Sequence, residues 1–132
     1  MDEASARALI LDHFAAAGVD EEHVGSIYTD DAILDFPQGG ERIRGRANIV
    51  AFRSVFPAQV GIVPRRITGS GDVWAIESTI SYDGEPHPLV TIWELHEGKL
   101  VHETSYVTDR WDPPAWRAQW VEPMPESGST MQ

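Results

Sequence analysis

The sequence contains no cysteine. Disulfide bridges, thiolate metal sites and cysteine nucleophiles are therefore excluded from the chemistry of this chain. Basic residues are also scarce: 10 lysines and arginines stand against 21 aspartates and glutamates, which gives a formal charge of −11 at pH 7. Such a charge repels phosphate backbones and anionic lipid surfaces, so we expect neither a nucleic acid nor a membrane as partner.

Long apolar runs and a basic, signal-like N-terminus are missing as well. The chain begins MDEASARALILDHF, and no apolar stretch approaches the roughly 20 residues that cross a membrane. A cytoplasmic location is the default expectation. We assign residues 1–122 to one domain with a single core, and we expect residues 123–132, PMPESGSTMQ, to form a disordered tail.

The spacing of apolar residues predicts three helices in the first half of the chain. The first runs over 3–17, a short second one is capped by Asp20, and the third runs over 46–56 until Pro57 stops it. The second helix would present three apolar residues to the core: Val24, Ile27 and Tyr28.

Strand-like segments surround and follow the third helix, separated by the turns PQGG, GSGD, YDGEP and HEG. We expect strands at 32–36, 42–44, 61–68, 73–82, 88–96 and 99–109. Helices gathered before a run of antiparallel strands are typical of an α+β domain whose helices cover one sheet face.

Three stretches resemble the SnoaL-like branch of the nuclear transport factor 2-like superfamily: IYTDDAILDFPQGGERIRGRANIVAF, YDGEPHPLVTIWELHEGKLVHETSYVTD and WRAQW. The resemblance covers about residues 6–122. It implies a curved antiparallel sheet that forms a cone over three helices around an internal pocket. It also suggests a homodimer that pairs through the outer sheet face. Family members include ketosteroid isomerases, polyketide cyclases, epoxide hydrolases and dehydratases.

The catalytic residues of the isomerases do not carry over to this sequence. By the resemblance, their general base falls on Phe36, their hydrogen-bonding acid on or near Thr91, and their oxyanion tyrosine near Phe14 or Asp12. A phenylalanine ring cannot accept a proton from carbon, so the isomerase mechanism is not expected.

Glu103 is the first candidate for acid–base catalysis, and its direction depends on the turn HEG, residues 96–98. A three-residue loop would place Glu103 on an otherwise apolar face, opposite Thr91, where lost hydration favours the protonated acid. A two-residue turn at Glu97–Gly98 would instead direct Glu103 to the other side of the sheet. Both registers remain open at this point.

Two further residues are candidates to assist Glu103. His13 lies on the apolar face of the first helix, where a histidine is either a catalyst or a hydrogen-bonded core residue. Asp109 shares the alternation of Glu103 and is either a second pocket carboxylate or a cap for the following turn. The five histidines lack ligand spacing, so we expect no metal and no cofactor.

Large, mostly apolar residues, together with Thr91, are expected to wall the pocket and bind the substrate. These candidates are Phe14, Phe36, Phe52, Phe56, Trp74, Ile76, Ile80, Tyr82, Thr91 and Trp93. Trp116 and Trp120 are four residues apart, so one helical turn would present both indoles on one face. We interpret this segment as a closing flap or dimer strap that hides its indoles against the cone, either as a lid or as a packing plug.

Two functions follow from these features. The first is binding of a hydrophobic polyketide-, terpene- or steroid-like molecule, with cofactor-free acid–base catalysis of cyclase, isomerase, hydrolase or dehydratase type by Glu103 if the protein is an enzyme. The alternative is a non-catalytic dimeric module with a filled or ligand-sequestering pocket. The isolated carboxylate favours the enzyme, and the shortage of other polar groups favours the module.

Overall fold

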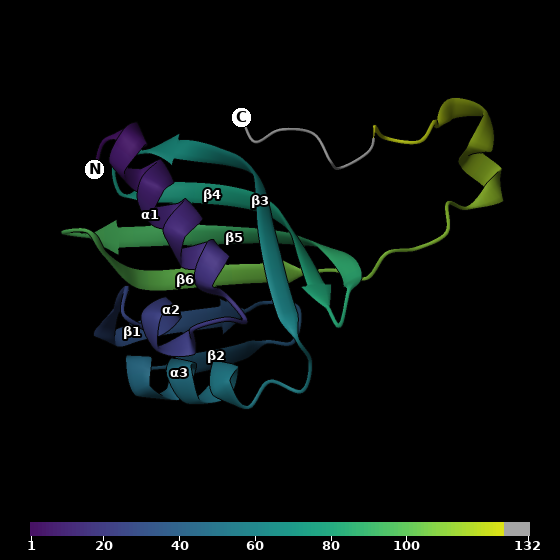
Figure 1. Cartoon of the computed structure of the whole chain (residues 1–132). Helices are drawn as coiled ribbons and strands as arrows, with labels where there is room; N and C mark the ends of the chain where they lie inside the picture. Colours follow the sequence, from purple (N-terminus) through teal and green to yellow (C-terminus); the bar gives the residue numbers. More distant parts are fainter. Residues whose placement is uncertain (126–132) are drawn as a thin grey trace.

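A computed structural model of the chain describes residues 1–125 (Figure 1). Within these residues, three α-helices precede or interrupt the strands, and a 3₁₀ helix follows them. The elements are α1 (Glu3–Ala16), α2 (Glu21–Gly25), β1 (Tyr28–Phe36), β2 (Glu41–Arg44), α3 (Arg46–Ser54), β3 (Val60–Ser70), β4 (Val73–Tyr82), β5 (Glu85–His96), β6 (Lys99–Val107) and η1 (Ala115–Trp120).

Side-chain caps begin the first two helices. The Asp2 carboxylate accepts a hydrogen bond from Ser5 N at 2.8 Å, and the predicted cap Asp20 accepts one from His23 N at 3.1 Å. Gly18 follows α1 with φ 77°, and a Cβ there would lie 1.9 Å from the Val60 carbonyl oxygen. Among residues 1–125, no helix is long and apolar enough to cross a membrane.

The six strands form one curved sheet in the order β2-β1-β6-β5-β4-β3, and it does not close into a barrel (Figure 1). The predicted α+β class and the cone-like curvature are confirmed. The sheet is not wholly antiparallel, however, because β1 pairs with β6 in parallel. The chain reaches β6 from β1 through α3 and the β3–β5 meander, a connection long enough to bring the two strands into parallel alignment.

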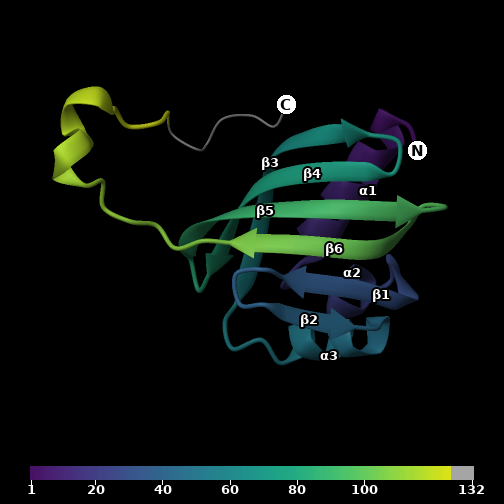
Figure 2. The same cartoon turned by 180° about the vertical axis from the view of Figure 1, so that it is seen from behind.

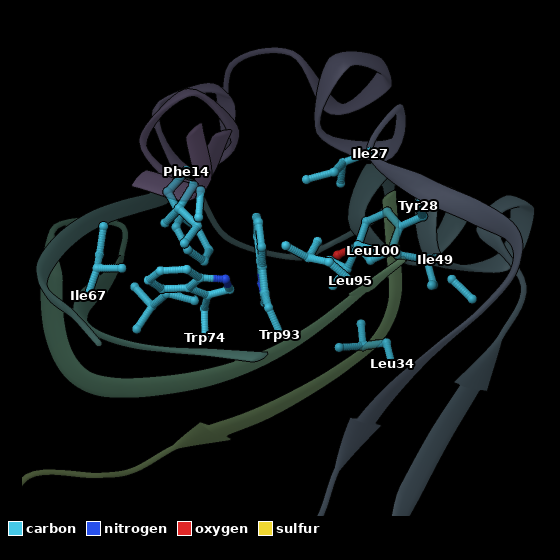
Figure 3. Close-up of a cluster of buried hydrophobic side chains, with 14 residues drawn as sticks. Phe14, Ile27, Tyr28, Leu34, Ile49, Ile67, Trp74, Trp93, Leu95 and Leu100 are labelled. Atoms are coloured by element: carbon cyan, nitrogen blue, oxygen red, sulfur yellow. The ribbon is translucent and has the colours of Figure 1, made fainter. Parts of the chain in front are cut away.

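All three α-helices lie on the same side of the sheet, and the opposite side is bare in the view from behind (Figures 1 and 2). The core fills the space between them. Trp74 of β4 and Trp93 of β5 stand on the inner face beneath Phe14 of α1 (Figure 3), and both indoles are almost fully buried. Burial alternates along β4, and Trp74, Ile76 and Ile80 of the expected pocket wall face inward.

The start of β1 differs from the expected helix boundary. Helix α2 ends at Gly25, where a Cβ would lie 2.3 Å from Val50 Cγ2 of α3. Five residues are too few for a helix to extend itself on hydrogen bonds alone, and tertiary packing decides where it stops. Tyr28, which we placed on the face of this helix, is instead the first residue of β1 and is fully buried.

Residues 108–125, which we call the C-terminal arm, leave the end of β6 and lead away from the sheet (Figures 1 and 2). The expected helical turn is present as η1, but its indoles do not pack against the cone. Trp116 and Trp120 are 75% and 72% exposed, and Trp111 is 74% exposed. The predicted tail overlaps the arm at 123–125, and its remainder, 126–132, lies outside the described residues.

Candidate functional site

Glu103 faces the helices, although by a different route from either expected register. Glu97 and Gly98 have φ of 50° and 78°, so they form a two-residue turn in which His96 pairs with Lys99. That turn alone would direct Glu103 outward. A bulge at Val101 then shifts the register by one residue, and Glu103 pairs with Trp93 rather than with Thr91.

Three side-chain donors converge on the Glu103 carboxylate, which is only 1% exposed. Tyr28 Oη and Arg53 Nη2 both donate to Oε1, the latter at 3.2 Å. Trp93 Nε1 donates to Oε2 at 2.8 Å. We expected an apolar wall around Glu103, but three polar side chains surround the carboxylate and donate hydrogen bonds to its oxygens. We call these four residues the Glu103 cluster.

The cluster also fixes the charge states of its other members. Burial opposes a charge on Arg53, but Tyr28 and Glu103 beside it hold the pKa of its guanidinium above the ordinary value. Burial raises the pKa of the Tyr28 hydroxyl, and the nearby Glu103 charge adds to this effect. Tyr28 therefore remains a neutral donor, with its own oxygen accepting from Arg53 Nη2 at 2.8 Å.

A cavity of about 80 Å³ opens beside the cluster, and Glu103 and Arg53 line it. Most of its remaining wall is apolar. Its lining includes seven of the predicted substrate-binding residues: Phe14, Phe36, Phe52, Phe56, Ile80, Tyr82 and Thr91. The other three do not line it, because Trp74 and Ile76 lie in the core and Trp93 supports Glu103 from the side.

Two buried polar atoms of residues that line this cavity have no hydrogen-bond partner within residues 1–125. They are Nε of Arg53 and Oγ1 of Thr91. Arg53 Nε is a donor, and a threonine hydroxyl can donate or accept. A buried polar atom without a partner is costly, so each one marks a position that a ligand oxygen or a water can satisfy.

His13 is buried away from this cavity. Its ring packs edge-on against Trp93 at 5.0 Å and Tyr28 at 6.0 Å between ring centres, and it lines a separate cavity between α1 and the β5–β6 turn. Burial, together with the Arg53 charge, lowers the pKa of His13 to about 3. The neutral His13 ring therefore contacts the Glu103 cluster by packing on the rings of Tyr28 and Trp93.

Asp109 stands outside the site as well. Its carboxylate is 98% exposed at the root of the C-terminal arm and lies 3.7 Å from His87 Nδ1. The structure therefore brings Glu103 alone, of the three candidate catalytic residues, to the cavity.

Tyr28 and Arg53 are two residues of the candidate site that the sequence did not predict. Tyr28 was missed because we expected the second helix to include it, whereas α2 ends at Gly25 and Tyr28 begins β1. Arg53 gave a usable signal, because it follows Ile49 by four residues and so lies on the buried side of α3. An arginine on an apolar helix face requires a buried partner, and Glu103 is that partner.

The model of the SnoaL-like domain matches residues 7–103. The chain belongs to the SnoaL-like family. A solved NTF-2 like protein of unknown function from Burkholderia xenovorans LB400 is 44% identical, with a TM-score of 0.83, over 94% of this chain and 98% of the other. No curated protein matches this SnoaL-like chain in sequence.

More distant structures share the fold of this SnoaL-like protein. A candidate ketosteroid isomerase from Kribbella flavida is 24% identical, with a TM-score of 0.83, over 98% of this chain and 96% of the other. An LEH-like epoxide hydrolase from M. tuberculosis is 19% identical, with a TM-score of 0.66, over 80% and 84%. These likenesses support the NTF2-like fold, whose members include isomerases, cyclases and hydrolases.

Proposed function

We propose that this SnoaL-like protein binds a compact, mainly apolar small molecule that presents a neutral oxygen to the Glu103 cluster. The observation that carries this proposal is the pair of unpartnered polar atoms, Arg53 Nε and Thr91 Oγ1, on residues lining an otherwise apolar cavity. Binding sites generally combine apolar walls with a few polar groups that orient the ligand.

The charge balance of the cluster favours a neutral ligand. Arg53 already faces the Glu103 carboxylate, so an anionic ligand would leave an excess negative charge in a buried site. The overall charge of −11 disfavours anions further. A ketone, ester, epoxide or alcohol oxygen satisfies Arg53 Nε and Thr91 Oγ1 without adding charge.

The cavity volume favours a small ligand or one end of a larger one. If each water-sized group needs about 10–15 Å³, then a volume of about 80 Å³ holds roughly five to eight such groups. A terpene- or polyketide-sized molecule would extend past the half-buried Phe56, Tyr82 and Val107 toward solvent.

Binding can be tested with a panel of neutral ketones, epoxides and alcohols and with two matched variants. Thr91→Val removes the cavity hydroxyl at almost constant shape, and Thr104→Val does the same outside the cavity. We expect Thr91→Val to weaken binding of the best ligand about tenfold, and Thr104→Val to leave it unchanged. Equal affinities for both variants in an NMR titration would contradict the proposed orientation.

A second function, proton transfer, is favoured by the free capacity of Glu103 Oε2. This oxygen accepts from Trp93 Nε1, and a carboxylate oxygen has room for about two donors. Glu103 could take a proton from the carbon beside a ligand carbonyl, while Arg53 Nε stabilises the charge that moves onto the carbonyl oxygen. If Glu103 returns the proton to a different carbon of the ligand, the result is isomerisation. If the ligand instead loses a hydroxide that takes up this proton as water, the result is dehydration.

Glu103 is already engaged by three hydrogen-bond donors, so ligand binding is the primary proposal and catalysis the secondary one. Deuterium exchange into a bound ketone in heavy water separates the two. If Glu103 is the base, wild-type protein catalyses exchange, and Glu103→Gln binds the ketone without exchanging its protons. Binding with no exchange by the wild type would leave a binding protein, and unchanged exchange by Glu103→Gln would rule out this base.

A further inference from the structure

A second carboxylate, that of Glu21, lines the cavity beside the Glu103 cluster. Glu21 is the first residue of α2, and its half-buried side chain reaches back to the end of α1, where Oε1 accepts a hydrogen bond from Gly18 N at 2.7 Å. None of the ion pairs within residues 1–125 includes Glu21. A carboxylate has about four acceptor sites, so one hydrogen bond leaves Glu21 with unused capacity.

The charged side chains that line the cavity do not balance. They are two carboxylates, Glu21 and Glu103, and one guanidinium, Arg53, so the wall carries a formal charge of −1. Arg53 and Glu103 form a direct ion pair. Burial opposes the charge on Arg53, and Glu21 contributes, after Tyr28 and Glu103, to holding the pKa of its guanidinium above the ordinary value. The charge without a close partner is that of Glu21, and one positive charge on a ligand would balance it.

Aromatic rings make up much of the same wall. Phe36, Phe52, Phe56 and Tyr82 follow one another with 5.4–6.0 Å between ring centres, and all four line the cavity. The face of an aromatic ring attracts a cation that lies within about 6 Å of its centre. An ammonium group is therefore favoured both by these rings and by the Glu21 carboxylate.

We propose that the ligand of this cavity is an amine, with its neutral oxygen at the Glu103 cluster and a protonated nitrogen at Glu21. This inference rests on the proposed function and adds the second end of the ligand. The two ends do not conflict, because the Arg53–Glu103 pair is balanced by itself and Glu21 is not. The overall charge of −11 also attracts cations. Compact amino alcohols and amino ketones combine the two groups.

Two small alcohols form a matched pair of probes. In 4-hydroxypiperidine the hydroxyl and the ring nitrogen stand on opposite sides of the ring, and the nitrogen is protonated at neutral pH. Its roughly seven non-hydrogen atoms match the five to eight water-sized groups that about 80 Å³ holds. Cyclohexanol has the same ring size and the same hydroxyl but no nitrogen, so the difference in affinity between the two reports on the ammonium alone.

NMR titration of the full chain at neutral pH, read from the amide shifts of the cavity residues, tests the proposal. We expect 4-hydroxypiperidine to bind about tenfold more tightly than cyclohexanol, because a charged hydrogen bond to Glu21 is added. Glu21→Gln keeps an oxygen for Gly18 N and should remove this preference. Glu22→Gln removes the same charge from the adjacent exposed residue, which does not line the cavity, and should retain the preference.

Cyclohexanol also shows whether the cavity of the Glu21→Gln variant is intact, since its affinity should equal that of the wild type. If the wild type binds both probes equally, the amine is ruled out and the proposed function stands. A preference that survives in Glu21→Gln would overturn the assigned partner. A preference lost in both variants would trace it to the overall charge and overturn the site. If neither probe binds, the proposed function fails, and this inference fails with it.

Discussion

The two faces of strand β6 carry similar charged groups in different surroundings. Glu103 points inward and meets Arg53, with side chains 2% and 21% exposed. Its neighbour His102 points outward and meets Asp35, which is also paired with Arg42, a side chain 48% exposed. One carboxylate–arginine pair therefore lies in the core, and the other lies at the surface of the same sheet.

The outer pair has the better geometry. Arg42 Nε and Nη2 donate to the two Asp35 oxygens at 2.7 and 2.9 Å, and His102 lies between Asp35 at 2.8 Å and Glu94 at 3.0 Å. The Arg42 hydrogen bonds lower the pKa of Asp35 to about 2. The comparison teaches that geometry alone does not decide importance: bulk water replaces a lost partner at the surface, whereas beside Glu103 burial makes the loss of the Arg53 charge costly.

The largest expected effect comes from removing the buried arginine, with removal of the surface arginine as the comparison. Arg53→Met leaves Glu103 as a buried, uncompensated charge and should lower the free energy of unfolding by about 3–5 kcal/mol. Arg42→Met removes a better-aligned but solvated partner and should cost no more than about 1 kcal/mol. Urea denaturation at neutral pH measures both, and equal losses would show that burial does not separate the two pairs.

The inner histidine should make stability depend on pH. The pKa of His13 is about 3 in the folded protein against 6.5 ordinarily, so the unfolded chain binds a proton first as the pH falls. His13 therefore contributes stability that is fully present above about pH 6.5 and decreases toward pH 3, by at most about 1.4 kcal/mol per pH unit.

His13→Leu should flatten that part of the stability profile. His96→Leu, which changes a histidine that is 72% exposed, should leave the profile unchanged and serves as the control. Denaturation curves recorded between pH 7 and pH 4 test this, and a His13→Leu variant that kept the wild-type slope would contradict the prediction.

A smaller effect is expected from the tyrosine hydroxyls on the two faces. Tyr28→Phe removes one donor from buried Glu103 and should cost about 1–2 kcal/mol. Tyr106→Phe changes a half-exposed ring on the outer face and should cost almost nothing to the folded monomer. Thermal melts at low protein concentration make this comparison. A Tyr28→Phe variant as stable as the wild type would show that the hydroxyl does not contribute to the Glu103 cluster.

The smallest effect should follow His102→Gln. The substitution removes one of the groups that favour ionised Asp35, so the pKa of Asp35 should rise from about 2 while Arg42 keeps it below 3.8. The lowered pKa means that this carboxylate stabilises the fold above about pH 4 and stops doing so as the pH falls toward 2. An NMR titration of Asp35 measures the change, and a further decrease would reverse the assigned role of His102.

The sequence by itself determined the element order, the fold family and the inward alternation of β4. These features depend on local signals: Asp20 as a helix cap, the glycine turns between hydrophobic strands, and the period-two pattern around Trp74 and Ile76. Each signal lies within a few residues of the structure that it specifies, so it can be recognised without the rest of the chain.

Only the tertiary structure decided how Glu103 acts. The bulge at Val101 returned it to the inner face after a two-residue turn, and no local pattern distinguishes a strand with that bulge from one without it. Its partners Tyr28 and Arg53 lie 75 and 50 residues earlier in the chain. The same distance dependence separates Trp93 from Trp120: both are large apolar side chains, but packing against α1 buries the first, while no part of the described chain covers the second.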